Sequence, residues 1–227
     1  SYSCRKGKGT LYGSKRISGF IKECSLDYTK QAYILKLDLE GYFYNIDKSI
    51  LFKIIKKQLS DNRALLGIDF DTIMYLIEKT IFDNALEDLQ KIGTRREWQR
   101  LPKNKSLFFA KEGMGLPIGN LTSLLFSNIY MNEFDRYVKD KLKIEYYGRY
   151  VDDFIVVHNS NEYLKSLIVE FREWLESNLG MRVHPKKIYL QPHQRGVKFL
   201  GSYIKPNVTY VDKRCKTNFY KLVYKIN

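Results

Sequence analysis

Hydrophobic and polar residues alternate along an early stretch of the chain, QAYILKLDLEGYFYNID (31–47). Ile34, Lys36 and Asp38 alternate with three leucines, and this period of two predicts a β-strand. The stretch DKSILFKIIKKQL follows, with an acidic capping residue, Asp47, ahead of apolar residues at helical spacing. The pattern therefore predicts a strand and then a helix.

Two further helices are predicted in the central part of the chain. One covers Phe70 to Leu86, and residues 90–112 after it form an irregular basic connection. The other begins after the turn-forming GLPIGN, and its apolar residues form two adjoining rows at i, i+4 spacing: Leu121, Leu125, Ile129 and Phe126, Tyr130, Phe134. Because the rows adjoin, we expect much of the surface of this helix to be buried.

The segment GRYVDDFIVVH (148–158) sets two adjacent carboxylates in an apolar run that favours β-structure. Its flanks, 144–151 and 154–158, predict a hairpin with the carboxylates at the tip. An amphipathic helix then ends at Gly180, and MRVHPKKIYLQ and GVKFLGSYIKP predict two more strands, separated by a turn near 192–196. This order predicts an α+β fold in which a mixed sheet is backed by helices on one face.

Composition and charge narrow the function classes. The chain has 227 residues, 44% of them hydrophobic, which suits one large domain or two small ones. Lys and Arg outnumber Asp and Glu by 39 to 25, and the excess of +14 is spread along the chain. This favours a polyanionic partner, with nucleic acid first, an anionic membrane surface second and a solvated surface without a partner third.

The remaining composition signals are negative. No apolar run approaches the length of a membrane span, and SYSCRKGKGT does not read as a signal peptide. Three widely spaced cysteines predict neither a disulfide framework nor a zinc site, which fits a reducing cytosol. The chain does not begin with Met, so we expect it to belong to a longer product.

The carboxylates Asp152 and Asp153 have two interpretations. Asp is common in solvated turns, so the pair is explained by turn chemistry alone. However, the flanks lack the Asn-Gly or Asp-Gly signals of tight hairpins, and Asp38 also ends an apolar run, ILKLD. Three carboxylates that emerge from apolar strands are reconciled if they meet around divalent cations, since Mg²⁺ prefers carboxylate oxygens. Two such ions would stabilise the attacking and leaving oxygens of phosphoryl transfer.

Five segments, LKLDLEGYF, GLPIGNLTSLLFSNIYMNEFD, RYVDDF, GMRVHPKK and VKFLGSYI, occur in the order of motifs A to E of reverse transcriptases, which the chain resembles from residue 31 onward. YxDD alone is a weak signal, whereas five motifs in order are a strong one. YSCRKGKGT, LPKNKSLF and GLPIGNLTS most resemble the reverse transcriptases of diversity-generating retroelements of bacteria and their phages. Leu124 departs from that subfamily, which usually has Gln after the motif B serine.

The resemblance implies a reverse-transcriptase palm, with a mixed and largely antiparallel sheet backed by helices, together with partial fingers and a largely missing thumb. Residues 1–30 would be a remnant of the fingers and their connection to the palm. The palm with motifs A to D would cover 31–193, with a helical insertion at about 60–112, and 194–227 would hold the primer-grip hairpin and the start of the thumb connection. We expect such a fragment to bind metal and nucleic acid but to polymerise poorly.

The resemblance also implies roles for individual residues. Asp38 and Asp152 would be the principal ligands of two Mg²⁺ ions, joined by the backbone carbonyl of Leu39, with Asp153 close by. Mn²⁺ is the expected substitute. Lys186 would protonate the pyrophosphate leaving group, and its neighbour Lys187 is expected to be a backbone-facing charge.

Further residues would contact the nucleotide, the primer or the template. The nucleotide-binding set is Gly41, Tyr42, Phe43, Ile118 and Gly119. The primer and template set is Asn120, Tyr150, Phe199, Leu200 and Gly201. Phe43 falls at the family's steric gate, where a ring would exclude a ribose 2′-OH; packing in the core is the alternative. Ile118 replaces a polar Gln that contacts the incoming nucleotide, which would weaken discrimination between base pairs; a packing role is equally compatible.

The resulting hypothesis is an RNA-directed DNA polymerase that makes error-prone cDNA in a diversity-generating retroelement. Its expected partners are an RNA template, a DNA or RNA primer, dNTPs and a small basic accessory protein, with no membrane. The expected location is the bacterial cytoplasm, in a host or phage system. The alternatives are a defence-associated or other bacterial reverse transcriptase, and a catalytically silent palm that binds nucleic acid.

Overall fold

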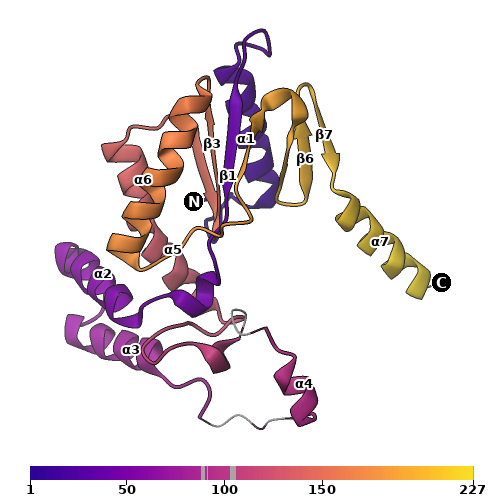
Figure 1. The fold of residues 1–227 in the computed structure, drawn as a ribbon. Coiled ribbons are helices and arrows are strands. Elements are labelled where there is room, and N and C mark those ends of the chain that lie inside the picture. The colour runs from indigo at the N-terminus through magenta and orange to yellow at the C-terminus, as the bar shows by residue number, and fades with distance from the viewer. Residues whose placement is uncertain (88–89, 91, 103–105, 227) are drawn as a thin grey trace. The chain divides into compact units, whose positions relative to one another are not determined.

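The computed structural model describes residues 1–87, 90, 92–102 and 106–226 (Figure 1). The helices are α1 (Thr10–Cys24), α2 (Lys48–Asp61), α3 (Phe70–Phe82), α4 (Arg95–Gln99), α5 (Leu121–Arg136), α6 (Asn161–Leu179) and α7 (Lys213–Ile226). The strands are β1 (Tyr33–Leu37), β2 (Tyr147–Tyr150), β3 (Asp153–His158), β4 (Tyr189–Pro192), β5 (Val197–Phe199), β6 (Ser202–Lys205) and β7 (Val208–Val211).

The chain divides into two compact units. The first unit comprises residues 1–38, 134–171 and 183–227, and it holds both sheets together with α1 and α7. The second unit comprises residues 39–133 and 172–182, and it holds α2, α3, α4 and most of α5. Helices α5 and α6 each contribute residues to both units.

The first unit is built on a four-stranded sheet in the order β2-β3-β1-β4. Each of its pairings is antiparallel, which confirms the predicted α+β fold with a largely antiparallel sheet. In the register of β1 and β3, Leu35 lies opposite Val156 and Leu37 lies opposite Phe154. Two distant segments of the sequence are therefore joined along their whole length.

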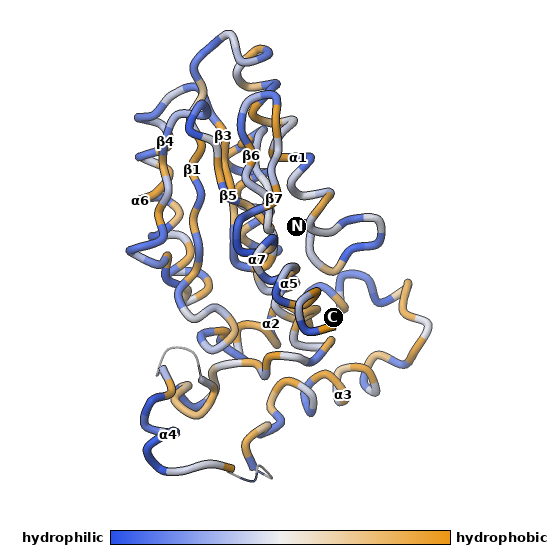
Figure 2. The backbone as a smooth tube through the Cα atoms, turned by 90° about the vertical axis from the view of Figure 1, so that its right-hand side faces the viewer, coloured by the Kyte–Doolittle hydropathy of each residue, from blue (hydrophilic) through white to orange (hydrophobic). Residues whose placement is uncertain are grey.

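Helices cover this sheet on both faces, so the prediction of helices on one face was wrong. Helix α1 packs on the face that carries Ile34 and Ile155. On the other face, Phe154 makes edge-to-face contacts with Phe134 of α5 and Phe171 of α6, with ring centroids 5.3 and 5.9 Å away. Burial on both sides explains why β3 is apolar without alternation, as its colour in Figure 2 shows.

A three-stranded sheet, β5-β6-β7, completes the first unit. It also packs on α1, and the side chains of Val197, Phe199 and Ile204 join the core there. The predicted turn before it is a short 3₁₀ helix, His193–Arg195. Helix α7 follows β7 and has no buried residue.

In the second unit, α2 begins as predicted at Asp47. The Asp47 carboxylate accepts hydrogen bonds from the backbone N–H groups of Ser49 and Ile50, at 2.8 and 2.9 Å. Helix α3 ends at Phe82, four residues before the predicted end. The predicted irregular segment 90–112 contains a short helix, α4, with a capping box formed by Thr94 and Glu97; residues 91 and 103–105 of that segment lie outside the described part.

Helix α5 corrects one expectation. Of its two predicted buried rows, Phe126, Tyr130 and Phe134 are buried, but Leu121 is 81% exposed and Leu125 is also exposed. Apolar spacing alone did not show which row faces the core. Among the described residues, no helix is both long and apolar enough to cross a membrane.

Candidate catalytic site

Strand pairing brings the three predicted carboxylates to one end of the sheet in the first unit. Asp38 directly follows β1, and the pairing of Leu37 with Phe154 places it beside Asp153, the first residue of β3. Asp152 lies in the two-residue turn that joins the paired residues Tyr150 and Asp153. Register therefore supplies the convergence that sequence spacing could not establish.

The turn that carries Asp152 has a costly backbone conformation. Val151 has a φ of 55°, in the left-handed region that β-branched residues rarely adopt. Such strain persists only where the surrounding structure imposes it, and it is concentrated at functional sites.

The carboxyl groups of Asp152 and Asp153 have raised pKa values, chiefly because they are buried. Burial raises the pKa of Asp152 to about 6, and the charges of Asp38 and Asp153 act in the same direction. Burial likewise raises the pKa of Asp153, against the opposing attraction of Lys36. The three carboxylates are therefore only partly compensated by neighbouring positive charges. Such incomplete compensation is typical of ligand-binding and catalytic sites.

Two lysines partly compensate this charge. The Lys187 ammonium lies 2.7 Å from Asp38 Oδ1, and that of Lys36 lies 3.2 Å from Asp153 Oδ2. Partial burial would lower the pKa of Lys187, but the hydrogen bond to Asp38 and the charges of the three carboxylates raise it. The backbone N–H of His184 also donates to the Asp38 carbonyl, at 2.8 Å, which fixes the turn that carries Lys187.

Lys187, and not Lys186, is the motif D lysine that contacts the carboxylates. The side chain of Lys186 is exposed, and its backbone N–H bonds the His184 ring at 3.2 Å. The proton-donor role of Lys186 remains a prediction, and the contact with Asp38 makes Lys187 a second candidate.

The site has the donor chemistry for a divalent cation, although its side chains do not enclose one. Within the described residues, no three His, Cys, Asp or Glu side chains form a group that could hold an ion. Asp153 Oδ1 is nevertheless buried without a hydrogen-bond partner among those residues. An orphaned carboxylate oxygen beside two further carboxylates fits an oxygen-seeking cation such as Mg²⁺.

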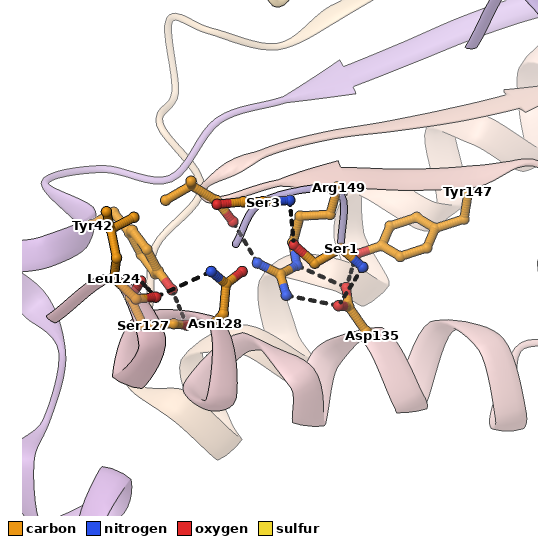
Figure 3. Close-up of polar contacts among 10 residues, drawn as sticks. Ser1, Ser3, Tyr42, Leu124, Ser127, Asn128, Asp135, Tyr147 and Arg149 are labelled. Atoms are coloured by element: carbon orange, nitrogen blue, oxygen red, sulfur yellow. Dashed lines mark hydrogen bonds and ion pairs between the residues drawn. The ribbon is translucent and has the colours of Figure 1, made fainter. Parts of the chain in front are cut away.

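The predicted nucleotide-binding residues lie in the second unit. Tyr42 is 3% exposed and its hydroxyl donates to the backbone carbonyl of Ser127, so its side chain is part of the core (Figure 3). Phe43 is half-buried against the Tyr42 ring, with centroids 5.2 Å apart. Ile118 is 60% exposed, which argues against the alternative packing role.

Glycine geometry is consistent with close approach of a ligand. Gly41 and Gly119 have φ values of 52° and 109°, and a Cβ on Gly119 would meet nothing within 4 Å. Asn120, next to Gly119, is exposed, whereas Leu39 is buried. The ligand roles of these residues remain predictions.

The predicted primer-binding residues of the first unit differ in how far their side chains are buried. Phe199 is 2% exposed, so its side chain serves the core. Leu200 and Gly201 form the two-residue turn between β5 and β6, with φ values of 51° and 78°, and Gly201 is exposed there. Tyr150 is half-buried and pairs with Asp153 across the hairpin.

Sequence reasoning missed Arg149 and Asp135. Arg149 is 1% exposed, and its Nε and Nη2 atoms donate to the two carboxylate oxygens of Asp135 at 2.8 and 2.7 Å (Figure 3). Tyr147 donates to the same carboxylate at 2.7 Å. The only sequence signal was a charged residue in an apolar strand, and its partner on α5 could not be identified by spacing.

Comparison with known proteins agrees with the fold. Residues 2–204 match the family model described as "Reverse transcriptase (RNA-dependent DNA polymerase)". Because the match covers most of the chain, the protein belongs to the reverse transcriptase family.

Two curated proteins are similar over most of this chain. Protein YkfC of Escherichia coli K12 is 23% identical over 88% of the chain and 54% of its own length. The putative COX1/OXI3 intron 2 protein of Saccharomyces cerevisiae is 20% identical over 80% of the chain and 24% of its own length. The chain thus spans about half of the first relative and a quarter of the second.

Solved structures of telomerase share the fold. Apo telomerase of Candida tropicalis, truncated from the C-terminal domain, has a TM-score of 0.64 at 17% identity, over 90% of this chain and 40% of that one. The C. tropicalis enzyme in complex with the TWJ fragment of telomeric RNA has a TM-score of 0.63 at 16% identity, over 90% and 33%. At these identities the likeness concerns the fold alone.

Proposed function

We propose that this chain carries the catalytic centre of an RNA-directed DNA polymerase. The observation that carries the proposal is the meeting of Asp38, Asp152 and Asp153 at one end of the sheet, where burial and the neighbouring carboxylates raise the pKa of Asp152. A family match alone would also suit a silent palm. Three neighbouring carboxylates favour a catalytically active palm. Burying like charges together is unfavourable unless a cation compensates them.

The chemistry follows from the site's charges. Bound divalent cations would supply the Lewis acid that polarises the phosphoryl group and the charge that stabilises the leaving pyrophosphate. Asp38 and Asp152 are the proposed ligands, with Asp153 beside them. Lys187 is placed to hold Asp38 in position and to offer a proton at its Nζ atom.

The proposed partners are an RNA template, a primer and dNTPs. The net charge of +14 suits polyanions, and a telomerase of the same fold is recorded with an RNA fragment. Binding should therefore weaken strongly as salt is raised.

The decisive experiment is primer extension on an RNA template with Mg²⁺, using the longest form of the protein that its gene encodes. The wild type is compared with the double variant Asp152→Asn, Asp153→Asn. Extension by the wild type that is lost in the variant supports the polymerase. RNA binding without extension by the wild type would favour a silent nucleic-acid-binding palm.

At a finer level, we propose error-prone cDNA synthesis of the kind found in diversity-generating retroelements. The support is the motif B sequence GLPIGNLTS, in which an apolar and exposed Ile118 stands where most relatives have Gln. Sequencing the extension products tests this. Errors concentrated opposite template adenines, and reduced by Ile118→Gln, support the proposal; accurate copying would favour another bacterial reverse transcriptase.

A further inference from the structure

The strongest feature that the proposed chemistry leaves unexplained is the buried guanidinium of Arg149. It comes from β2, an edge strand of the four-stranded sheet, and it is among the largest fully buried side chains of the described residues. Two of its nitrogens bind the Asp135 carboxylate in a bidentate pair. Such a pair has no evident advantage for stability over apolar residues, because desolvation of both charges offsets their attraction.

A third nitrogen of the same guanidinium reaches the catalytic hairpin. Arg149 Nη1 donates to the backbone carbonyl oxygen of Val151, at 2.7 Å. That carbonyl belongs to the peptide group between Val151 and Asp152. The nitrogen and the Cα atom of Asp152 lie in the plane of this same peptide group. Arg149 thus holds the peptide plane from which the Asp152 side chain extends.

The turn needs such a restraint. Val151 adopts a φ of 55°, which is unfavourable for a β-branched residue and must be imposed by its surroundings. A relaxed turn would rotate the peptide plane and redirect the Asp152 side chain. Only a planar fork with several donors bonds both Asp135 oxygens and the Val151 carbonyl at once, which Lys cannot do.

We propose that Arg149, held in place by Asp135, is a positioning residue that fixes the Val151–Asp152 peptide and thereby aims the Asp152 carboxylate. The inference rests on the proposed function, since it assumes that Asp152 is a reacting group. Asp135 acts through Arg149, and Tyr147, two residues before Arg149 on β2, supports Asp135 by donating a hydrogen bond to its carboxylate.

Two variants test the proposal. Arg149→Lys keeps the charge and loses the fork. The double variant Asp135→Asn, Arg149→Gln removes both charges of the pair, so neither is left in the core without the other, and it guards against loss of folding in the single variant. Arg182→Lys is the matched control, because Arg182 forms an exposed pair with Glu176, at 3.0 Å.

The measurements are kcat and KM for primer extension per folded molecule, thermal unfolding, and binding of Mn²⁺ alone by electron paramagnetic resonance. For both Arg149 variants we expect kcat to fall 10- to 100-fold and Mn²⁺ affinity to fall by a similar factor, as is typical when a residue that orients a ligand is lost. The KM for dNTP should change little, and Arg182→Lys should match the wild type throughout.

The outcomes distinguish failure of the proposed role of Arg149 from failure of the proposed polymerase function. If the wild type extends primers and the folded Arg149 variants keep its kcat and its Mn²⁺ affinity, Arg149 is structural only and the inference fails alone. If the wild type neither extends primers nor binds Mn²⁺, the proposed function fails and the inference with it.

Discussion

Asp135 and Asp152 belong to the same unit and are both withdrawn from water, yet their carboxyl groups have opposite pKa shifts. Burial would raise the pKa of Asp135, but Arg149 and Tyr147 bind its carboxylate and hold the pKa below the usual value. Burial also acts on Asp152, where two neighbouring carboxylates add to it, and the pKa rises to about 6. The two regions differ in how far their negative charge is compensated.

This difference separates a structural carboxylate from a functional one. The Asp135 cluster is complete, since a buried Arg and a buried Tyr satisfy both of its oxygens. The cluster of Asp38, Asp152 and Asp153 has only two partly exposed lysines and leaves Asp153 Oδ1 without a partner among the described residues. Charge that the fold leaves uncompensated is available to a ligand. Arg149 links the two regions through its third hydrogen bond.

The largest effect is expected from Asp152→Asn. If Asp152 holds a catalytic cation, the loss of several kcal/mol of transition-state stabilisation lowers kcat about 10³-fold. Without the cation, the free energy of unfolding should stay the same or rise, because an uncompensated carboxylate has been removed. Primer extension and urea unfolding in EDTA measure the two quantities. A clear loss of stability would show that Asp152 is structural, like Asp135.

Asp135→Asn, unlike Asp152→Asn, should lower the stability of the protein. The variant removes the carboxylate that balances the buried charge of Arg149, so the free energy of unfolding should fall by about 3 kcal/mol. Asp140→Asn is the control: its pair with Arg136 is exposed, at 4.0 Å, and is expected to contribute less than about 1 kcal/mol. Urea unfolding of both variants decides the point, and equal effects would remove the contrast on which the comparison depends.

Lys187→Met tests which lysine acts at the proposed catalytic carboxylates. If Lys187 both holds Asp38 and supplies a proton, kcat should fall about 10²-fold, at the lower end for acid–base catalysis. We expect this loss to exceed that of Lys186→Met at least tenfold, since Lys187 is the one of these two lysines that the structure shows against a carboxylate. Rapid-quench kinetics compare the two variants. A larger effect at Lys186 would restore the assignment made from the motif.

The smallest effect is a dependence on pH. The pKa of Asp135 is lower in the folded chain than in the unfolded one, where it is about 3.9. Its contribution to stability is therefore present above pH 4 and is lost as pH falls through the folded value. The difference in unfolding free energy between the wild type and Asp135→Asn should be constant from pH 5 to 7 and shrink below pH 4. A difference that grows on acidification would contradict the assigned sign.

The sequence predicted those parts of the site that follow from local pattern. Asp38, Asp152 and Asp153 stood out as charges in apolar strands, and Asp47 and Gly180 marked helix ends correctly. The alternation in β1 did not show that both faces are covered. That depends on where Phe134 and Phe171, far along the chain, are brought by folding.

The missed features depend on tertiary contacts. Two adjacent lysines in HPKK are equivalent in spacing, and only the turn at His184 directs Lys187 to Asp38. Arg149 and Asp135 are 14 residues apart, on a strand and a helix, so no period connects them. Tyr42 and Phe199 were assigned to ligands from motif position, whereas the structure buries their rings.

One measurement tests most directly whether the uncompensated carboxylates await a cation: the thermal unfolding midpoint with and without Mg²⁺. The wild type, Asp140→Asn and the double variant Asp152→Asn, Asp153→Asn are compared. Mg²⁺ at 100 times its Kd should stabilise the first two proteins by about 2.7 kcal/mol and leave the double variant unchanged. If Mg²⁺ fails to stabilise the wild type, or stabilises the double variant equally, these carboxylates are not a metal site and the account is contradicted.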